Sequence, residues 1–94
     1  MVLGPELTPL GLDFLTEAAV VGSLTPEAAA ILARFNGLDD GAGRESTREI
    51  LGILEHDGYL KRPVKEYVFV SRLLKEWWKA RFGFAYVPAA DRSV

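Results

Sequence analysis

Apolar residues recur at helical spacing along two stretches of the N-terminal half, and each stretch follows a Thr-Pro pair. In Thr8-Pro9 and again in Thr25-Pro26, the threonine is a good N-cap and the proline suits the first helical position. Gly22 and Asn36-Gly37 supply the stops, because glycine accepts the left-handed backbone that ends many helices. The pattern predicts two helices. Their buried faces are expected to hold Leu12, Leu15, Ala18 and Ala19, opposite Asp13 and Glu17, and then Ala28, Ile31, Leu32 and Phe35.

A third helix is predicted after a polar, glycine-rich stretch at residues 36–43, which is typical of a loop. Ser46-Thr47-Arg48-Glu49 fits a capping box, in which the serine and the glutamate three residues later satisfy free backbone N–H groups. The helix is therefore expected to begin at residues 44–46 and to end at Asp57-Gly58. Its core positions are Ile50, Leu51 and Leu54.

Two short runs rich in β-branched and aromatic residues then break the helical period. Tyr59–Arg62 and Tyr67–Val70 flank residues 63–66, and this spacing predicts a β-hairpin with a four-residue turn. Three helices, a two-stranded ribbon and a last helix are the element order of a winged helix-turn-helix domain, an α+β fold that is mostly helical. The predicted connection between the second and third helices is longer than the three or four residues of a tight helix-turn-helix.

Ser71 is the expected N-cap of the last helix, which carries two adjacent tryptophans. Because neighbouring residues on a helix point about 100° apart, Trp77 and Trp78 cannot share one narrow buried stripe. We expect one to pack on the ribbon and the third helix. The other lies partly at the surface, where it either meets a partner or simply fills space in a small domain. Residues 83–94 are predicted to form a loose tail, in which Pro88 prevents a regular element.

The composition fits a single domain over residues 1–94, with its core at about residues 8–82. A chain of 94 residues with 49% hydrophobic and 26% charged residues is typical of one folded globule. The absence of cysteine excludes disulfides and thiolate metal sites, and a lone histidine, His56, excludes a histidine-built zinc site within one chain. No apolar run approaches the roughly 20 residues that cross a bilayer. We expect a cytoplasmic protein with no membrane partner and no cofactor.

The sequence contains no recognisable set of catalytic residues. The position five residues after Gly37 is Ala42, and no Gly-Lys-Ser/Thr follows, so the glycine-rich stretch is not a Walker loop. His56 is the one imidazole available to any serine nucleophile, and the helix dipole alone explains a histidine in the last turn of a helix. We therefore expect no enzyme activity.

Charge is distributed unevenly along the chain. Residues 1–60 carry three basic and ten acidic side chains, a net charge of −7, whereas residues 61–94 carry eight basic and three acidic ones, a net charge of +5. The positive third either attracts phosphates or only keeps exposed faces solvated. The third helix and the wing of a winged helix contact DNA. The candidate DNA-binding residues are accordingly Arg44, Thr47, Arg48, Lys61, Arg62 and Lys65. Four acidic residues over 44–57 favour the simpler interpretation that the helix arginines pair with neighbouring glutamates.

The segments LEHDGYL (54–60) and YVFVSRLLKEWW (67–78) resemble the C-terminal winged-helix domain of bacterial and archaeal P-loop ATPases of the AAA/STAND type. In that family a leucine-rich helix ends in an LEHDGYL-like segment before the wing. An F-x-S-x-L-L-x-x-W-W pattern then leads into the last helix. The resemblance covers residues 44–82. It implies a module that packs against a P-loop ATPase core domain, in the same or another chain. The candidate protein-interface residues are Trp77, Trp78, Arg72 and Lys75.

Two other interpretations stay open. One is a small dimeric transcriptional regulator that binds double-stranded DNA through the cations named above. The other is a chain that associates with a second copy of itself. Both share the expected winged-helix fold, so the fold alone does not distinguish them.

Overall fold

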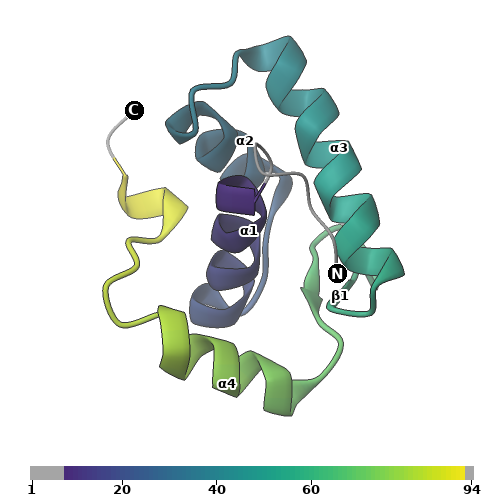
Figure 1. Ribbon diagram of the computed structural model, residues 1–94, viewed down its shortest axis with the longest axis vertical. Helices are drawn as coiled ribbons and strands as arrows, with labels where there is room; N and C mark the ends of the chain where they lie inside the picture. The colour runs from purple at the N-terminus through teal and green to yellow at the C-terminus, as the bar shows by residue number, and fades with distance from the viewer. Residues whose placement is uncertain (1–7, 93–94) are drawn as a thin grey trace.

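The computed structural model describes residues 8–92, and four helices account for most of them (Figure 1). The elements are α1 (Thr8–Val21), α2 (Pro26–Phe35), α3 (Asp40–His56), β1 (Leu60–Lys61), β2 (Val68–Phe69), α4 (Arg72–Phe82) and the 3-10 helix η1 (Ala89–Asp91). The predicted class, α+β and mostly helical, is confirmed. The element order is compatible with a winged helix.

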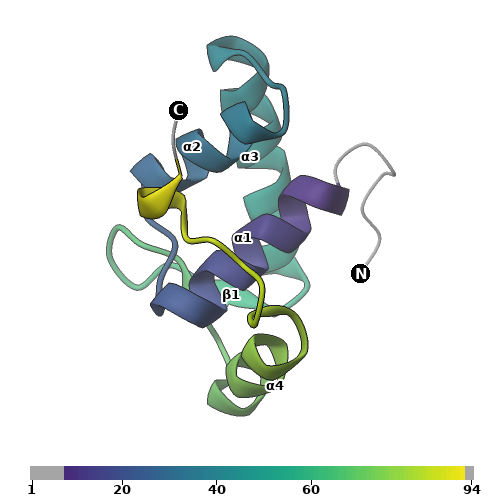
Figure 2. The same cartoon turned by 90° about the vertical axis from the view of Figure 1, so that its left-hand side faces the viewer.

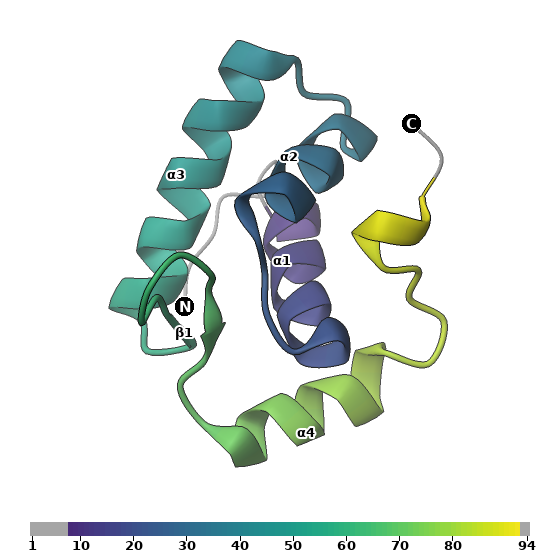
Figure 3. The same cartoon turned by 180° about the vertical axis from the view of Figure 1, so that it is seen from behind.

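Helix α1 lies at the centre, and the other helices pack around it (Figures 1 and 3). Phe14 and Leu15 of α1 are fully buried in one core with Leu32 of α2 and with Ile50 and Leu54 of α3. Each such side chain stabilises the fold by about 1.5–3 kcal/mol relative to an exposed position. Among the described residues, no helix has the length and apolar character required to cross a membrane.

Two apolar positions that we expected in the core lie at the surface instead. Leu12 and Phe35 are both exposed. Helix α1 is apolar on several sides because α2, α3 and α4 all pack on it. The helical spacing of its apolar residues therefore does not show that Leu12 faces outward. The Arg92 guanidinium lies over the exposed Phe35 ring, 5.2 Å from its centroid.

The predicted helix ends are confirmed where local cap chemistry decides them. The Thr25 hydroxyl accepts a 3.0 Å hydrogen bond from the Ala28 N–H, and the Ser71 hydroxyl accepts one of 3.1 Å from the Leu74 N–H. Gly58 ends α3 at a φ of 83°, a left-handed conformation that costs glycine little. Helix α1 begins at Thr8, one residue earlier than the predicted first helical position.

The predicted start of α3 is wrong by about four residues. The helix begins at Asp40, and the carboxylate of Asp39, rather than Ser46, caps it by accepting a 2.8 Å hydrogen bond from the Ala42 N–H. The glycine-rich stretch is helical because Gly43 lets α2 and α3 approach closely. A Cβ at Gly43 would lie 3.3 Å from the Cβ of Ala33. The connection between α2 and α3 is thus residues 36–39, the length of a tight helix-turn-helix.

The ribbon is shorter than predicted. Leu60 pairs with Phe69 and Lys61 with Val68, so the strands have two residues each and the intervening loop, residues 62–67, has six rather than four. Tyr67 leaves the ribbon to pair with Leu24, through backbone hydrogen bonds of 2.8 and 3.0 Å. This bridge ties the base of the wing to the segment between α1 and α2.

The segment after α4 is not a loose tail over its described residues, 83–92. It crosses α1 and places η1 against α2 (Figure 2). Glu17, which we expected on the solvent face of α1, is only 3% exposed, because its Oε1 accepts hydrogen bonds from the Tyr86 hydroxyl (2.5 Å) and the Ala89 N–H (3.0 Å). We call residues 83–92 the strap. Residues 93 and 94 of the predicted tail lie outside the described residues.

Candidate functional site: a cationic groove and an exposed aromatic strip

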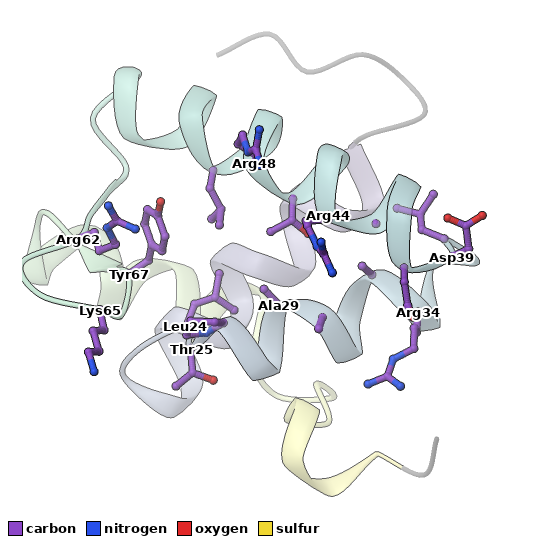
Figure 4. Close-up of a pocket in the computed structure, with 18 residues that line it drawn as sticks. Leu24, Thr25, Ala29, Arg34, Asp39, Arg44, Arg48, Arg62, Lys65 and Tyr67 are labelled. Carbon is purple, nitrogen blue, oxygen red and sulfur yellow. The ribbon is translucent and has the colours of Figure 1, made fainter.

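A groove of about 450 Å³ runs between α2 and α3 and is closed at one end by the wing loop (Figure 4). Five of the six candidate DNA-binding residues line it, and they come from two separate parts of the chain. Thr47 and the arginines 44 and 48 project from α3, whereas Arg62 and Lys65 come from the wing loop. The sixth candidate, Lys61, is exposed on β1 and does not line the groove.

The positions of α3 that line the groove share one face of the helix. Residues 40, 43, 44, 47, 48 and 51 follow the spacing of three and four that brings side chains to one side. Glu45 and Glu49 do not follow it and are exposed on another face. The net charge of the whole helix therefore does not describe the charge of this face. On the part of the face nearest the wing, the arginines are the dominant charges.

The groove is cationic toward the wing and carries charges of both signs at its other end. Arg34 of α2 adds a fifth positive charge to its rim, against the two carboxylates of Asp39 and Asp40 at the α2–α3 turn. Within residues 8–92, none of these five cations takes part in an ion pair. The expected pairing of the α3 arginines with neighbouring glutamates is therefore not seen, and the guanidinium groups face solvent.

Short side chains make the floor of the groove apolar. Its lining includes Ala29, Ala30 and Ala33 from α2 and Leu51 from α3. Tyr67 closes the wing end, with the Arg62 guanidinium 5.7 Å from its ring centroid (Figure 4). Sequence reasoning missed this floor and Arg34. The spacing of Ala29, Ala30 and Ala33 on one side of α2 was the available signal, but small residues in a helix usually indicate close packing.

Trp78 is a core residue, not an interface residue. It is 7% exposed, and its indole N–H donates a 3.1 Å hydrogen bond to the Thr16 hydroxyl on α1. That hydroxyl in turn donates to the Leu12 carbonyl at 2.7 Å. The Trp78 ring lies 6.4 Å from that of Phe69 on β2. The expected packing on the wing is confirmed, but its helical neighbour is α1 and not the third helix.

Trp77 lies on the outer side of α4 and is 55% exposed. It shares that side with Leu73, which is 82% exposed, and with Ala80, at the i, i+4 and i+7 positions of a second apolar stripe. We call these three residues the α4 strip. Four cations occur on this helix, and two of them, Arg72 and Lys75, are interface candidates from the sequence. The four are Arg72, Lys79 and Arg81, which are exposed, and Lys75, which is half-buried.

His56 is exposed at the end of α3, with its Nδ1 3.5 Å from Oδ1 of Asp57. Ser46 lies on the same helix ten residues before His56, whereas Ser23 and Ser71 lie outside α3. Within residues 8–92, no group of three or more His, Asp or Glu side chains is arranged to hold a metal ion.

Comparison of the chain with protein-family models, with curated proteins and with solved structures finds no match. The functional argument therefore rests on the groove and on the α4 strip.

Proposed function

We propose that this chain is a non-catalytic winged-helix module that acts by docking on another protein domain through α4. The observation that carries the proposal is the α4 strip, in which Leu73 and Trp77 face solvent although the helix already has a buried side. Large exposed apolar side chains that adjoin one another mark interaction sites more often than isolated ones do. Tryptophan is also enriched among the residues that dominate binding energies.

The winged-helix assignment is supported by the connections as well as by the element order. The turn between α2 and α3 has four residues, and α3 leads directly into the antiparallel ribbon. The bridge between Leu24 and Tyr67 adds a third extended segment beside the ribbon.

The charges beside the strip specify the docking surface of the partner. Three exposed cations, Arg72, Lys79 and Arg81, and one exposed carboxylate, Glu76, accompany the apolar residues on α4, so the net charge beside the strip is positive. A complementary surface has an apolar depression rimmed by carboxylates. The resemblance of residues 44–82 to domains of AAA/STAND ATPases supports a P-loop ATPase core as that partner.

Site-specific photo-crosslinking in the native host tests this proposal. A benzophenone amino acid in place of Trp77 is expected to crosslink to a protein that contains a P-loop ATPase domain, identified by mass spectrometry. The matched control carries the same group in place of Val64, which is even more exposed than Trp77 but lies on the wing loop. Crosslinks to the same proteins from both positions, or no ATPase among the products from position 77, would contradict the proposal.

A second candidate function is binding of duplex DNA, and the groove favours it. Arg44, Thr47 and Arg48 face the same side as the wing cations Arg62 and Lys65, as expected for a helix in the major groove with a wing over the phosphates. The acidic residues of α3 at 45 and 49 lie away from this side.

Titration of a labelled duplex at two salt concentrations tests DNA binding. The logarithm of the association constant is expected to fall by about 0.9 for each neutralised phosphate per tenfold rise in salt. Arg48→Gln is expected to weaken duplex binding. Arg72→Gln is the matched control, because it removes one positive charge from α4, outside the groove, and it is expected to have a smaller effect. Equal effects of both variants, or no binding at low salt, would exclude the groove as a DNA site.

A further inference from the structure

We infer that the groove between α2 and α3 binds a small amphipathic organic anion, one with an apolar body of one or two rings and a carboxylate or phosphate group. Its volume of about 450 Å³ lies within the range of small-molecule sites, about 300–1,000 Å³. It also combines an apolar floor with cations at one end. This binding requires neither DNA nor the docking partner.

The floor is closed and apolar because of where the small residues lie. Ala30 is exposed and Ala29 and Ala33 are buried, so α2 offers a shallow surface of methyl groups to the groove. Beneath it, Gly43 brings α3 so close to Ala33 that a Cβ would lie within 3.3 Å. The two helices therefore meet at the bottom of the groove, and an apolar body can rest on them without reaching the core.

The charges fix the orientation of the ligand. Arg48, Arg62 and Lys65 surround the wing end, while Asp39 and Asp40 lie at the opposite end (Figure 4). At the second end the two carboxylates offset the charges of Arg34 and Arg44, so an anionic group is attracted more strongly to the wing end. The body then extends along the alanines, and the face of Tyr67 is available to an aromatic ring beside the anion.

A small anion fits this groove better than a duplex does. DNA is contacted by side chains that protrude into its grooves and reach its phosphates, and such contacts leave an apolar hollow between two helices unfilled. An apolar body excludes water from the floor, which neither a phosphate nor a base edge can do. Because both ligands use Arg48 and the wing cations, each is expected to weaken the binding of the other by the same factor.

Calorimetry and amide chemical-shift mapping with four probes test the inference. The probes are 1-naphthoate, 1-naphthyl phosphate, the neutral 1-naphthalenemethanol and inorganic phosphate. At least one naphthyl anion is expected to bind and to shift the amides of residues 29–33 and 43–48. The neutral compound and inorganic phosphate are each expected to bind about tenfold more weakly or worse. The stronger of the two anions identifies carboxylate or phosphate as the natural group.

Two variants separate this inference from the DNA proposal. Ala30→Leu fills the groove from an exposed position and is expected to lower the affinity for the naphthyl anion about tenfold. The affinity for duplex DNA, which depends on phosphate contacts, is expected to change less than twofold. Ala85→Leu, at an exposed alanine of the strap outside the groove, is the matched control and is expected to leave both unchanged. If circular dichroism shows that Ala30→Leu disturbs the fold, the double variant Arg62→Gln, Lys65→Gln replaces it as the test of the groove and is expected to weaken binding of the naphthyl anion about tenfold. Because this double variant also removes candidate DNA contacts, the direct titration of the naphthyl anions in the absence of DNA then separates the two proposals.

Four results would overturn the inference. One is equal affinity for the neutral and anionic naphthyl compounds. Another is equal affinity of the wild type and the groove variants for the naphthyl anion. The third is chemical-shift changes centred on the α4 strip. Duplex binding without binding of either naphthyl anion would also overturn it and would leave the DNA proposal standing.

Discussion

The Tyr86 hydroxyl donates a 2.5 Å hydrogen bond to Oε1 of Glu17, so the strap is fastened to the central helix across 69 positions of sequence. The same oxygen accepts the Ala89 N–H, and Ala89 is buried against the core. A carboxylate that is 3% exposed is costly to bury without such donors. The strap thus supplies the polar partners that allow Glu17 to lie inside the molecule.

This contact makes stability depend on pH in the alkaline range. Burial, and then the hydrogen bond to Glu17, raise the pKa of Tyr86 well above its usual range. The folded state therefore keeps the phenol proton when the unfolded state loses it near pH 10. The stabilising contribution of Tyr86 is present in full below pH 10 and declines as the pH rises above it.

Tyr86→Phe tests this dependence. The variant is expected to lose about 1–3 kcal/mol at pH 8, because one donor to a buried carboxylate is removed. The difference in unfolding free energy between wild type and variant should shrink from pH 8 to pH 11, measured by urea denaturation. A difference that stays constant over this range would show that Tyr86 titrates normally in the folded chain.

The two adjacent tryptophans are expected to differ sharply in their contribution to stability. Trp78→Phe removes the donor to Thr16 and part of a buried ring, so a loss of about 1–4 kcal/mol in unfolding free energy is expected. Trp77→Phe should change it by less than about 0.5 kcal/mol, because that ring is at the surface. Chemical denaturation of the two variants side by side measures both, and equal losses would contradict the assignment of Trp78 to the core.

The observed start of α3 is tested by removing its cap. Asp39→Ala is expected to cost about 0.5–2 kcal/mol, since it leaves the Ala42 N–H without its side-chain acceptor. Ser46→Ala should cost little, because Ser46 lies within the helix and not at its start. Thermal unfolding of both variants measures the two losses. The opposite ranking would restore the capping box as the start of the helix.

Two glycines in α3 are expected to respond in opposite ways to substitution. Gly43→Val should destabilise the fold by about 1–3 kcal/mol, because even a Cβ would lie within 3.3 Å of Ala33. Gly52→Ala should stabilise it by up to about 1 kcal/mol, since Gly52 is exposed and a Cβ there meets no atom within 4 Å. Urea midpoints measure both effects. A harmless Gly43→Val would mean that α2 and α3 do not meet closely.

The sequence predicts this fold best where the deciding interaction is local. The caps at Thr25 and Ser71 and the stop at Gly58 depend on neighbours within four residues, so short motifs suffice to place them. The cap at Asp39 is equally local, but glycines on both sides of Ala42 are typical of a loop. Only the close approach of Ala33 shows why Gly43 is tolerated in the helix.

The remaining errors concern contacts between residues far apart in sequence. Glu17 has the spacing of an exposed position on α1, and nothing near it indicates that Tyr86 will cover it. The groove is a similar case. Arg44 and Arg48 were identified, but their grouping with Arg62 and Lys65, and their separation from Glu45, follow from how α3 and the wing are placed. The net charge of a sequence segment does not show which of its charged residues share one face of the folded chain.

The unlike surroundings of Trp77 and Trp78 give the chain a built-in optical reporter. A dissolved collisional quencher such as iodide reaches an indole that is 55% exposed far more readily than one that is 7% exposed. The fluorescence of the native protein should therefore divide into a quenchable and a shielded fraction. A partner that covers the outer side of α4 would shield the first fraction, whereas a ligand in the groove would leave it open to the quencher, so unlabelled protein can report which surface is occupied.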